Sequence, residues 1–215
     1  MRLRPTKNSP TGCPRYGIFG GTFDPVHLGH LIAAQAAGQS LKLDRIIFIP
    51  AGSPPHKRRR RVTEAGLRLR MVKLAIAGDR RFRVSDIELR SPQPSYTVAT
   101  LKRLKQEHPG VEFYLLMGWD QAILLDTWRN PEEIFKLARV VLLGRPGYDP
   151  RDIPPRWRSR AISVEVPRVD ISSSQIRRMV REGKDIKYLV PEAVERFIRR
   201  QGLYNDRAGA YLTRR

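Results

Sequence analysis

Short apolar runs alternate with amphipathic stretches along most of this 215-residue chain. Apolar runs bounded by turn residues predict buried strands, and apolar positions three and four residues apart predict helices. The predicted strands cover residues 16–20, 45–50, 82–89, 113–118, 139–144 and 161–166. The predicted helices cover residues 31–37, 64–78, 96–108, 172–181 and 191–200.

This alternation is typical of a parallel α/β sheet with right-handed crossovers. We expect a single Rossmann-like, doubly wound parallel sheet flanked by helices, with a small helical part near the C-terminal end. Residues 51–62 and 147–160 show no clear periodicity and are expected to be irregular. One domain is expected over residues 16–203, with 1–15 as a basic, mobile leader and 204–215 as a mobile tail.

Two of the predicted helices begin at residues that can cap them. Thr63 precedes the helix at 64–78, where its hydroxyl can accept a hydrogen bond from a first-turn N–H. Ser172 can do the same for the helix at 172–181, and Gln175 completes a capping box. The apolar stripe of the first of these helices is formed by Ala65, Leu69, Val72 and Ile76.

Composition narrows the class of protein. Hydrophobic residues make up 40% of the chain, which excludes a wholly disordered protein. No apolar run approaches the roughly 18 residues that a membrane span needs. Residues 1–15 contain no apolar stretch of the secretory kind, and the single cysteine, Cys13, permits no internal disulfide. We therefore expect a cytoplasmic protein without a membrane partner.

The net charge of +20 indicates anionic ligands. Basic residues are scattered along the chain, and aromatic residues are not interleaved with the basic run at 56–61, as stacking on bases would require. We therefore expect a polyphosphate ligand rather than a specific nucleic acid.

The segment between the first predicted strand and the first predicted helix predicts a phosphate site. Gly20 and Gly21 allow a tight turn whose free N–H groups face one spot. His27 and His30 lie three residues apart, on one face of the helix's first turn. Gly29 between them is expected to let a flat ligand approach the backbone. Amides at a helix N-terminus together with two imidazoles suit a bound phosphate.

Two further segments are candidates for binding phosphate. Ser172–Ser174 place three hydroxyls at the positive end of a predicted helix, with Arg177 one turn further on. His56 and Lys57 lie in the loop after the second predicted strand. Such loops at the carboxyl ends of parallel strands border the ligand crevice.

These segments resemble those of the nucleotidyltransferase superfamily. Its signatures are matched by Gly-Gly-Thr-Phe-Asp-Pro followed by His-x-Gly-His at 20–30, and by Ile-Ser-Ser-Ser-Gln-Ile-Arg at 171–177. Over about residues 16–203 the chain resembles one branch, the bacterial nicotinate-nucleotide adenylyltransferases. The further shared segments are Pro-Pro-His-Lys at 54–57, Tyr-Thr-x-x-Thr-Leu at 96–101, Gly-Trp-Asp at 118–120 followed by Trp128, Arg-Pro-Gly at 145–147 and Val-Pro at 190–191.

The resemblance implies adenylyl transfer from ATP to nicotinate mononucleotide, which forms nicotinate adenine dinucleotide and pyrophosphate in NAD biosynthesis. It implies that His27, His30 and Arg177 are catalytic, that Asp120 meets the ribose of ATP, and that Trp128 stacks on the pyridine ring. The implied ATP-binding residues are Gly20, Gly21, Thr22, Phe23, His27, His30, Gly118, Asp120, Ile171, Ser172, Ser173 and Arg177. The implied mononucleotide-binding residues are Tyr96, Thr97, Trp128 and Arg129, and the implied phosphate-binding loop contains His56 and Lys57.

The implied reaction needs no general base, because the attacking phosphate is already ionised at pH 7. Catalysis would consist of positioning and charge stabilisation during an in-line transfer at the α-phosphorus. No carboxylate cluster is visible in the sequence. We therefore expect Mg²⁺ to be held mainly by the ATP phosphates and water, with no metal ligand from the protein.

The sequence leaves several alternatives open. Pantetheine-phosphate adenylyltransferases share both phosphate signatures but are shorter and usually have threonine at the position of His27. Nicotinamide mononucleotide is an alternative acceptor, because backbone amides carry the distinction, and a basic nucleic-acid-binding protein is the alternative from a different class. A cytidylyltransferase would lack the Tyr-Thr and Trp set, and a class I tRNA synthetase would need further domains. Trp119 is bulky where the family commonly has a small residue, and whether the chain forms a homo-oligomer stays open.

Overall fold

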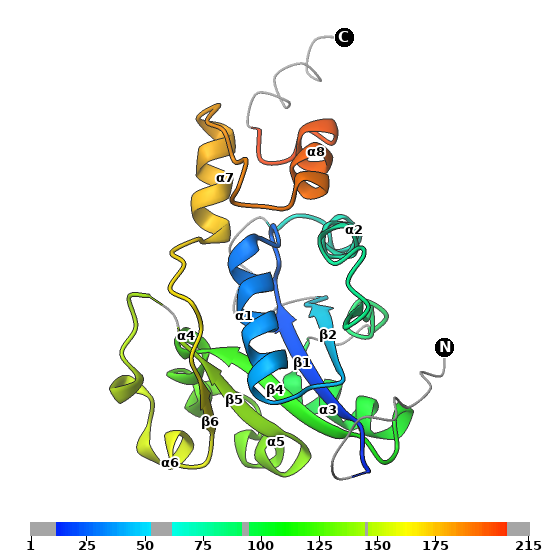
Figure 1. The fold of residues 1–215 in the computed structure, drawn as a ribbon, viewed down its shortest axis with the longest axis vertical. Coiled ribbons are helices and arrows are strands. Elements are labelled where there is room, and N and C mark those ends of the chain that lie inside the picture. Colours follow the sequence, from blue (N-terminus) through cyan, green and yellow to red (C-terminus); the bar gives the residue numbers. More distant parts are fainter. Residues whose placement is uncertain (1–11, 53–61, 92–94, 145, 206–215) are drawn as a thin grey trace.

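A computed structural model describes residues 12–52, 62–91, 95–144 and 146–205. Within these residues, six parallel strands form one sheet, which confirms the predicted α/β class (Figure 1). The strands lie in the order β3-β2-β1-β4-β5-β6. They are β1 (Arg15–Gly21), β2 (Arg45–Pro50), β3 (Phe82–Val84), β4 (Glu112–Gly118), β5 (Arg139–Leu143) and β6 (Ile162–Val164).

The strand order reverses between β1 and β4, which is the point where doubly wound sheets bind ligands. Phe19 of β1 is paired with Leu116 of β4. Gly21 and Gly118 therefore both lie where these two strands end, at the same carboxyl edge of the sheet. The two glycine-containing segments singled out in the sequence meet at this crevice edge.

Helices cover both faces of the sheet. One face is covered by α1 (Leu28–Ser40), α2 (Ala65–Ala75), α7 (Ser173–Arg181) and α8 (Glu192–Arg200). The other face is covered by α3 (Thr97–Glu107), α5 (Pro131–Leu137) and α6 (Pro155–Arg158). The four central strands, β2, β1, β4 and β5, send alternate side chains to the two cores, as the pleat requires.

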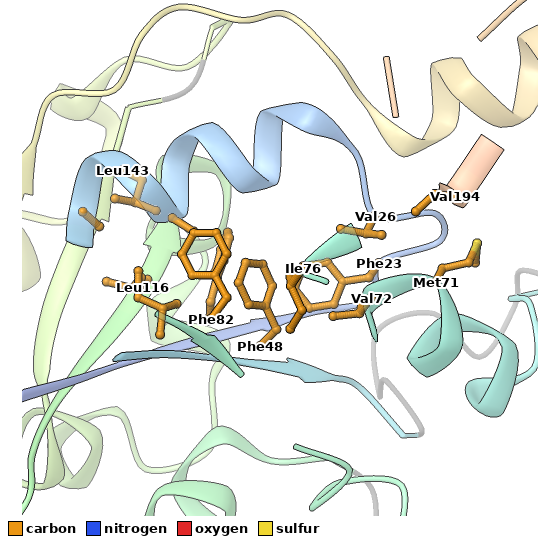
Figure 2. Packing of buried hydrophobic residues seen from close by; sticks show 14 of the residues in the cluster. Phe23, Val26, Phe48, Met71, Val72, Ile76, Phe82, Leu116, Leu143 and Val194 are labelled. Atoms are coloured by element: carbon orange, nitrogen blue, oxygen red, sulfur yellow. The ribbon is translucent and has the colours of Figure 1, made fainter. Parts of the chain in front are cut away.

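The core on the α1 face reaches the loop between β1 and α1. Figure 2 shows Phe23 of that loop beside Val72 of α2, and Val26 beside Val194 of α8. All four side chains are buried. The loop is thus packed between two helices that come from distant parts of the sequence.

The strand predicted at 82–89 was wrong in length, because β3 ends at Val84. The Ser85 hydroxyl accepts a hydrogen bond from the Ile87 N–H, and the Leu89 N–H donates to the Asp86 carbonyl. These local bonds turn the chain and replace further pairing with β2.

The start of α2 also differs from its prediction. Glu64, and not Thr63, occupies the N-cap, and its side chain makes no capping hydrogen bond. The apolar stripe is interrupted, because the side chain of Arg68 is only 1% exposed whereas Leu69 is half-buried. At α7 the predicted cap is confirmed, since the Ser172 hydroxyl accepts from the Gln175 N–H at 3.1 Å.

The irregular segment predicted at 147–160 and the start of the tail predicted at 204–215 both have defined structure. Residues 147–160 contain the 3-10 turn η3 (Pro150–Asp152) and α6. Both begin at prolines, which are compatible with a first helical turn. Tyr204, which the sequence analysis assigns to the tail, packs against the core of the domain. The described part of the chain holds no helix long and apolar enough to cross a membrane.

Candidate active site

The turn after β1 brings the two predicted histidines together. The rings of His27 and His30 are stacked, with centroids 3.7 Å apart. His27 is the N-cap of α1, and its backbone N–H donates to Nδ1 of His30 at 3.2 Å. His27 is buried, while His30 is half-buried. This part of the prediction, two imidazoles on one helix turn at the crevice edge, matches the geometry.

The glycines of this turn serve different purposes. A Cβ atom on Gly29 would lie 3.1 Å from Nδ1 of His27, so the glycine makes room for that ring. That a flat ligand approaches the backbone at Gly29 stays a prediction. A Cβ atom on Gly21 would lie 2.8 Å from the Phe23 ring, whereas one on Gly20 would meet nothing within 4 Å. The open space of the turn is at Gly20.

Aromatic packing holds the turn rigidly over the sheet. Phe23 is buried, with its backbone in the left-handed region at φ 49°, and its ring contacts His30 edge-on at a centroid distance of 5.0 Å. The rings of Phe19 and Phe48 lie 5.8 Å from the Phe23 ring. His30 is thereby fixed from its apolar side.

The start of α7 docks onto this turn across about 150 residues of sequence. The Ser173 hydroxyl donates to the Pro25 carbonyl at 2.8 Å. Arg177 donates through Nη1 to the Asp24 carbonyl at 2.6 Å and through Nη2 to the Ser174 hydroxyl at 3.2 Å. The two predicted phosphate-binding segments thus form one continuous surface.

A pocket of about 730 Å³ opens beside the start of α7. Its lining includes two predicted residues, Ser172 and Arg177. The other lining residues are Ser174 and Gln175, which were also singled out in the sequence, and Asp170, Arg178 and Arg181, which were not. Arg178 and Arg181 follow Ser174 at helical spacing, which is the signal that could have identified them.

The end of β4 places the predicted ribose partner at the same edge. Gly118 is the N-cap of the short helix α4 (Trp119–Ala122), and Asp120 lies half-buried in its first turn. The Trp119 indole lies over Gly144, whose added Cβ would be 3.5 Å from Cζ2 of the indole. Trp119 therefore packs against the end of β5.

The predicted mononucleotide residues gather at the start of α3. Tyr96 is the N-cap of α3, Thr97 is its first residue, and the Arg129 guanidinium lies 4.9 Å from the centroid of the Tyr96 ring. Trp128 is half-buried against the same core as Tyr96. The Asp126 carboxylate, two residues before Trp128, accepts hydrogen bonds from Arg156 and from the Trp157 indole N–H. These bonds lower the pKa of Asp126, the bond from Arg156 contributing most.

Comparison with known proteins identifies the family. The family model for cytidylyltransferase-like proteins matches residues 18–179. A protein of Thermomicrobium roseum, named as a probable nicotinate-nucleotide adenylyltransferase, is 45% identical over 88% of this chain and 91% of its own length. A protein of Geobacillus kaustophilus with the same name is 44% identical over 91% of this chain and 88% of its own. The chain belongs to the nicotinate-nucleotide adenylyltransferase family.

Solved structures of this family have the same fold. The chain aligns with a Plasmodium falciparum nicotinic acid mononucleotide adenylyltransferase complexed with NaAD at a TM-score of 0.73 and 20% identity. The alignment covers 89% of this chain and 97% of the other. A structure of the Plasmodium protein complexed with APC gives a TM-score of 0.72 at 21% identity.

One buried charge in this family member was missed by the sequence analysis. Arg68 of α2 donates to the carbonyls of Thr22, Ala51 and Thr63 at 2.7 to 2.8 Å. Burial lowers the pKa of Arg68, while the nearby carboxylate of Asp24 acts in the opposite direction. The available signal was its position, four residues before Val72 on the apolar stripe.

A second missed group lies under the start of α3. Glu88 accepts a hydrogen bond from the Thr100 hydroxyl at 2.8 Å, and the Gly52 N–H donates to the Ser95 hydroxyl at 3.0 Å. Burial raises the pKa of the Glu88 carboxyl, and the hydrogen bonds to this carboxyl from Thr100, Ser95 and the Gly52 backbone lower it by less. Glu88 thus supports the segment that leads to Tyr96.

The remaining predictions concern metal and the basic loop. Among the residues that the structure describes, no group of three or more His, Cys, Asp and Glu side chains is placed to hold a metal ion. That Mg²⁺ is held mainly by phosphates and water stays a prediction. His56, Lys57 and the arginine run at 58–61 lie outside the described residues, as does Arg145.

Proposed function

We propose that this chain transfers the adenylyl group of ATP to nicotinate mononucleotide, forming nicotinate adenine dinucleotide and pyrophosphate. The observation that carries the proposal is the docking of α7 onto the β1–α1 turn, which unites two imidazoles, an arginine and a helix N-terminus. This combination suits a polyphosphate. Membership of the family supports nicotinate mononucleotide as the acceptor.

In the proposed mechanism the protein positions two nucleotides and stabilises developing charge. His27, His30 and Arg177 neutralise charge on the departing pyrophosphate, and the N–H groups of Gly20 to Phe23, with Ile171 to Ser173, surround the phosphates. Mg²⁺ held by the phosphates and water would neutralise further charge. The acceptor phosphate is ionised and attacks directly, so no side chain removes a proton.

The remaining residues set the identity of the two nucleotides. Asp120, next to Gly118, accepts hydrogen bonds from the ribose hydroxyls of ATP. Trp128 stacks on the pyridine ring. The backbone amides near Thr97 and Arg129, beside Tyr96, donate hydrogen bonds to the nicotinate carboxylate. His56 and Lys57 are proposed to add positive charge near the phosphates. The reaction requires the ATP supply of the cytoplasm, and we propose that compartment.

One panel of acceptors tests the proposal. Pyrophosphate release from ATP is measured with nicotinate mononucleotide, nicotinamide mononucleotide and phosphopantetheine. We expect release that depends on nicotinate mononucleotide and is much slower with the other two acceptors. Equal or faster release with either of them would replace the proposed acceptor. Salt-sensitive oligonucleotide binding without release from any acceptor would favour the nucleic-acid-binding alternative.

A further inference from the structure

Asp24 joins three distant parts of the chain beside the proposed phosphate site. Its carboxylate accepts from the Tyr204 hydroxyl at 2.7 Å and from the Thr63 N–H at 3.3 Å. Its backbone carbonyl accepts from Arg177 at 2.6 Å. Asp24 is only 5% exposed, so these bonds stand in for the water that would otherwise surround the carboxylate.

Tyr204 lies just after α8 and connects it to the active-site turn through a hydrogen bond to Asp24. Tyr204 comes directly after Leu203, whose N–H donates to the Ile198 carbonyl in the last turn of α8. The backbone of Tyr204 is in the left-handed region, at φ 66°. Its hydroxyl also lies 3.9 Å from the Met71 sulfur of α2. Burial raises the pKa of the Tyr204 phenol well above its ordinary value, so the hydroxyl keeps its proton and donates a hydrogen bond to the carboxylate.

The same residue therefore connects the C-terminal helix with Arg177. The hydroxyl of Tyr204 holds the side chain of Asp24, and the main chain of Asp24 holds the guanidinium of Arg177. Arg68 fixes the turn two residues earlier, through the Thr22 carbonyl. If the carboxylate lost its partner from Tyr204, the Asp24 peptide would be held from fewer directions, and the carbonyl that orients Arg177 would move more freely.

We infer that Tyr204 is a positioning residue for adenylyl transfer, which orients Arg177 through Asp24. The inference rests on the proposed function, in which Arg177 stabilises the departing pyrophosphate. Tyr204 itself touches no reacting atom in this arrangement. Its contribution is the placement of a charge, and small misplacements of such groups are costly to the rate.

The test is Tyr204→Phe, which removes one oxygen and keeps the ring. We expect kcat to fall about tenfold, with a smaller change in the KM for ATP, because the affected charge acts mainly on the leaving group. The matched control is Tyr188→Phe. Tyr188 has nearly the same backbone conformation, at φ 67°, but its side chain is 77% exposed. The control variant should keep its kcat within twofold.

A double-variant cycle distinguishes positioning from a general loss of structure. If Tyr204 acts through Arg177, Tyr204→Phe should change kcat less than twofold in a chain that already carries Arg177→Ala. The inference would be overturned if Tyr204→Phe lowered kcat tenfold in the Arg177→Ala chain, as much as in the unaltered chain. An unchanged kcat in Tyr204→Phe alone would also overturn it. If Tyr204→Phe does not fold, Asp24→Asn, which weakens the same hydrogen bond, is put through the same cycle.

Calorimetric titration with inorganic pyrophosphate and Mg²⁺ separates this inference from the proposed function. One outcome would refute the proposed function alone. In it, the unaltered chain is inactive with every acceptor of the panel, while Tyr204→Phe binds pyrophosphate several-fold more weakly than the unaltered chain and Tyr188→Phe binds it equally well. Equal pyrophosphate affinities in the unaltered chain and Tyr204→Phe, together with equal kcat values, would refute the inference alone. No pyrophosphate binding and no turnover in the unaltered chain would refute both.

Discussion

At the scale of single residues, the stacked pair of His27 and His30 leaves little free space around the first turn of α1. His27 fills the space that Gly29 leaves, and His30 is held between the His27 ring and the Phe23 ring. Precision here comes from packing rather than from a network of ion pairs.

Replacing His30 tests the proposed role of this pair. We expect His30→Ala to lower kcat about 10²–10³-fold, because a donor to the developing charge is lost. The thermal midpoint should change little, since His30 is half-buried and lies at the start of α1. Steady-state kinetics beside thermal unfolding measure both effects. His108→Ala is the control, because the His108 ring lies edge-on to Tyr16, just after the end of α3. A folded His30→Ala variant with near-normal kcat would remove His30 from the mechanism.

Trp128 is the residue that tests the acceptor side. The ring is half-buried against the core on the α3 face of the sheet, and stacking on the pyridine would add binding energy for that substrate only. Trp128→Ala should therefore raise the KM for nicotinate mononucleotide about tenfold and leave the KM for ATP within twofold. Equal increases for both substrates would contradict the assignment of Trp128.

At the scale of elements, α2 shows how the loops at the carboxyl edge are held. Arg68 reaches from this helix to carbonyls of the β1–α1 loop and of the segment after β2. A planar guanidinium satisfies several carbonyls in fixed directions, which a lysine ammonium does less well. The helix thus stabilises both segments through one side chain.

Removing this guanidinium should destabilise the fold. Arg68→Met leaves the carbonyls of Thr22, Ala51 and Thr63 without their donor, and we expect a loss of about 3 kcal/mol in the free energy of unfolding. Urea unfolding measures the loss. Arg70→Met, on the exposed side of the same helix, is the control and should stay within about 0.5 kcal/mol of the unaltered chain. Similar losses in both variants would show that Arg68 contributes no more than surface packing.

At the scale of the whole molecule, periodicity predicted the sheet well but not its buried polar groups. The β1–β2–β4–β5 strands are long apolar runs, and their pattern alone places them in the centre of a parallel sheet. β3 is short because local hydrogen bonds at Ser85 end it, and hydrophobicity does not report such bonds. Arg68 and Tyr204 were missed because their partners are carbonyls and a carboxylate far away in sequence, which no local pattern contains.

The candidate site was predictable to a similar extent. The adjacency of His27 and His30 follows from helical spacing, and the capping by Ser172 follows from the order of residue types. The docking of Arg177 on Asp24 depends on how α7 returns to the first loop, which needs the complete topology. The resemblance to the family indicated that the two signature segments, at 20–30 and 171–177, act in one site. The contact between them is seen only in the folded chain.

Stability of the whole molecule should depend on the protonation of Glu88. Burial raises its pKa above the ordinary value of 4.5, so the folded chain binds this proton more tightly than the unfolded chain does. Its contribution to stability is therefore present at low pH and is lost as the pH rises through the raised value. Glu88→Gln removes this titration. The thermal midpoint of Glu88→Gln relative to the unaltered chain should increase as the pH rises above the ordinary value of 4.5. Parallel pH profiles would contradict this.

The parallel strands of the molecule give its sheet an amino edge and a carboxyl edge, and a label can be attached at the amino edge. Its one cysteine, Cys13, is exposed and lies just before β1, at the amino edge of the sheet. Seven residues lie between Cys13 and Gly21, and this nearly extended stretch spans about 25 Å. A maleimide-bearing surface or dye coupled to that thiol would leave the carboxyl edge facing outward. The protein can therefore be tethered in one orientation, with both nucleotide approaches open, without introducing a single substitution.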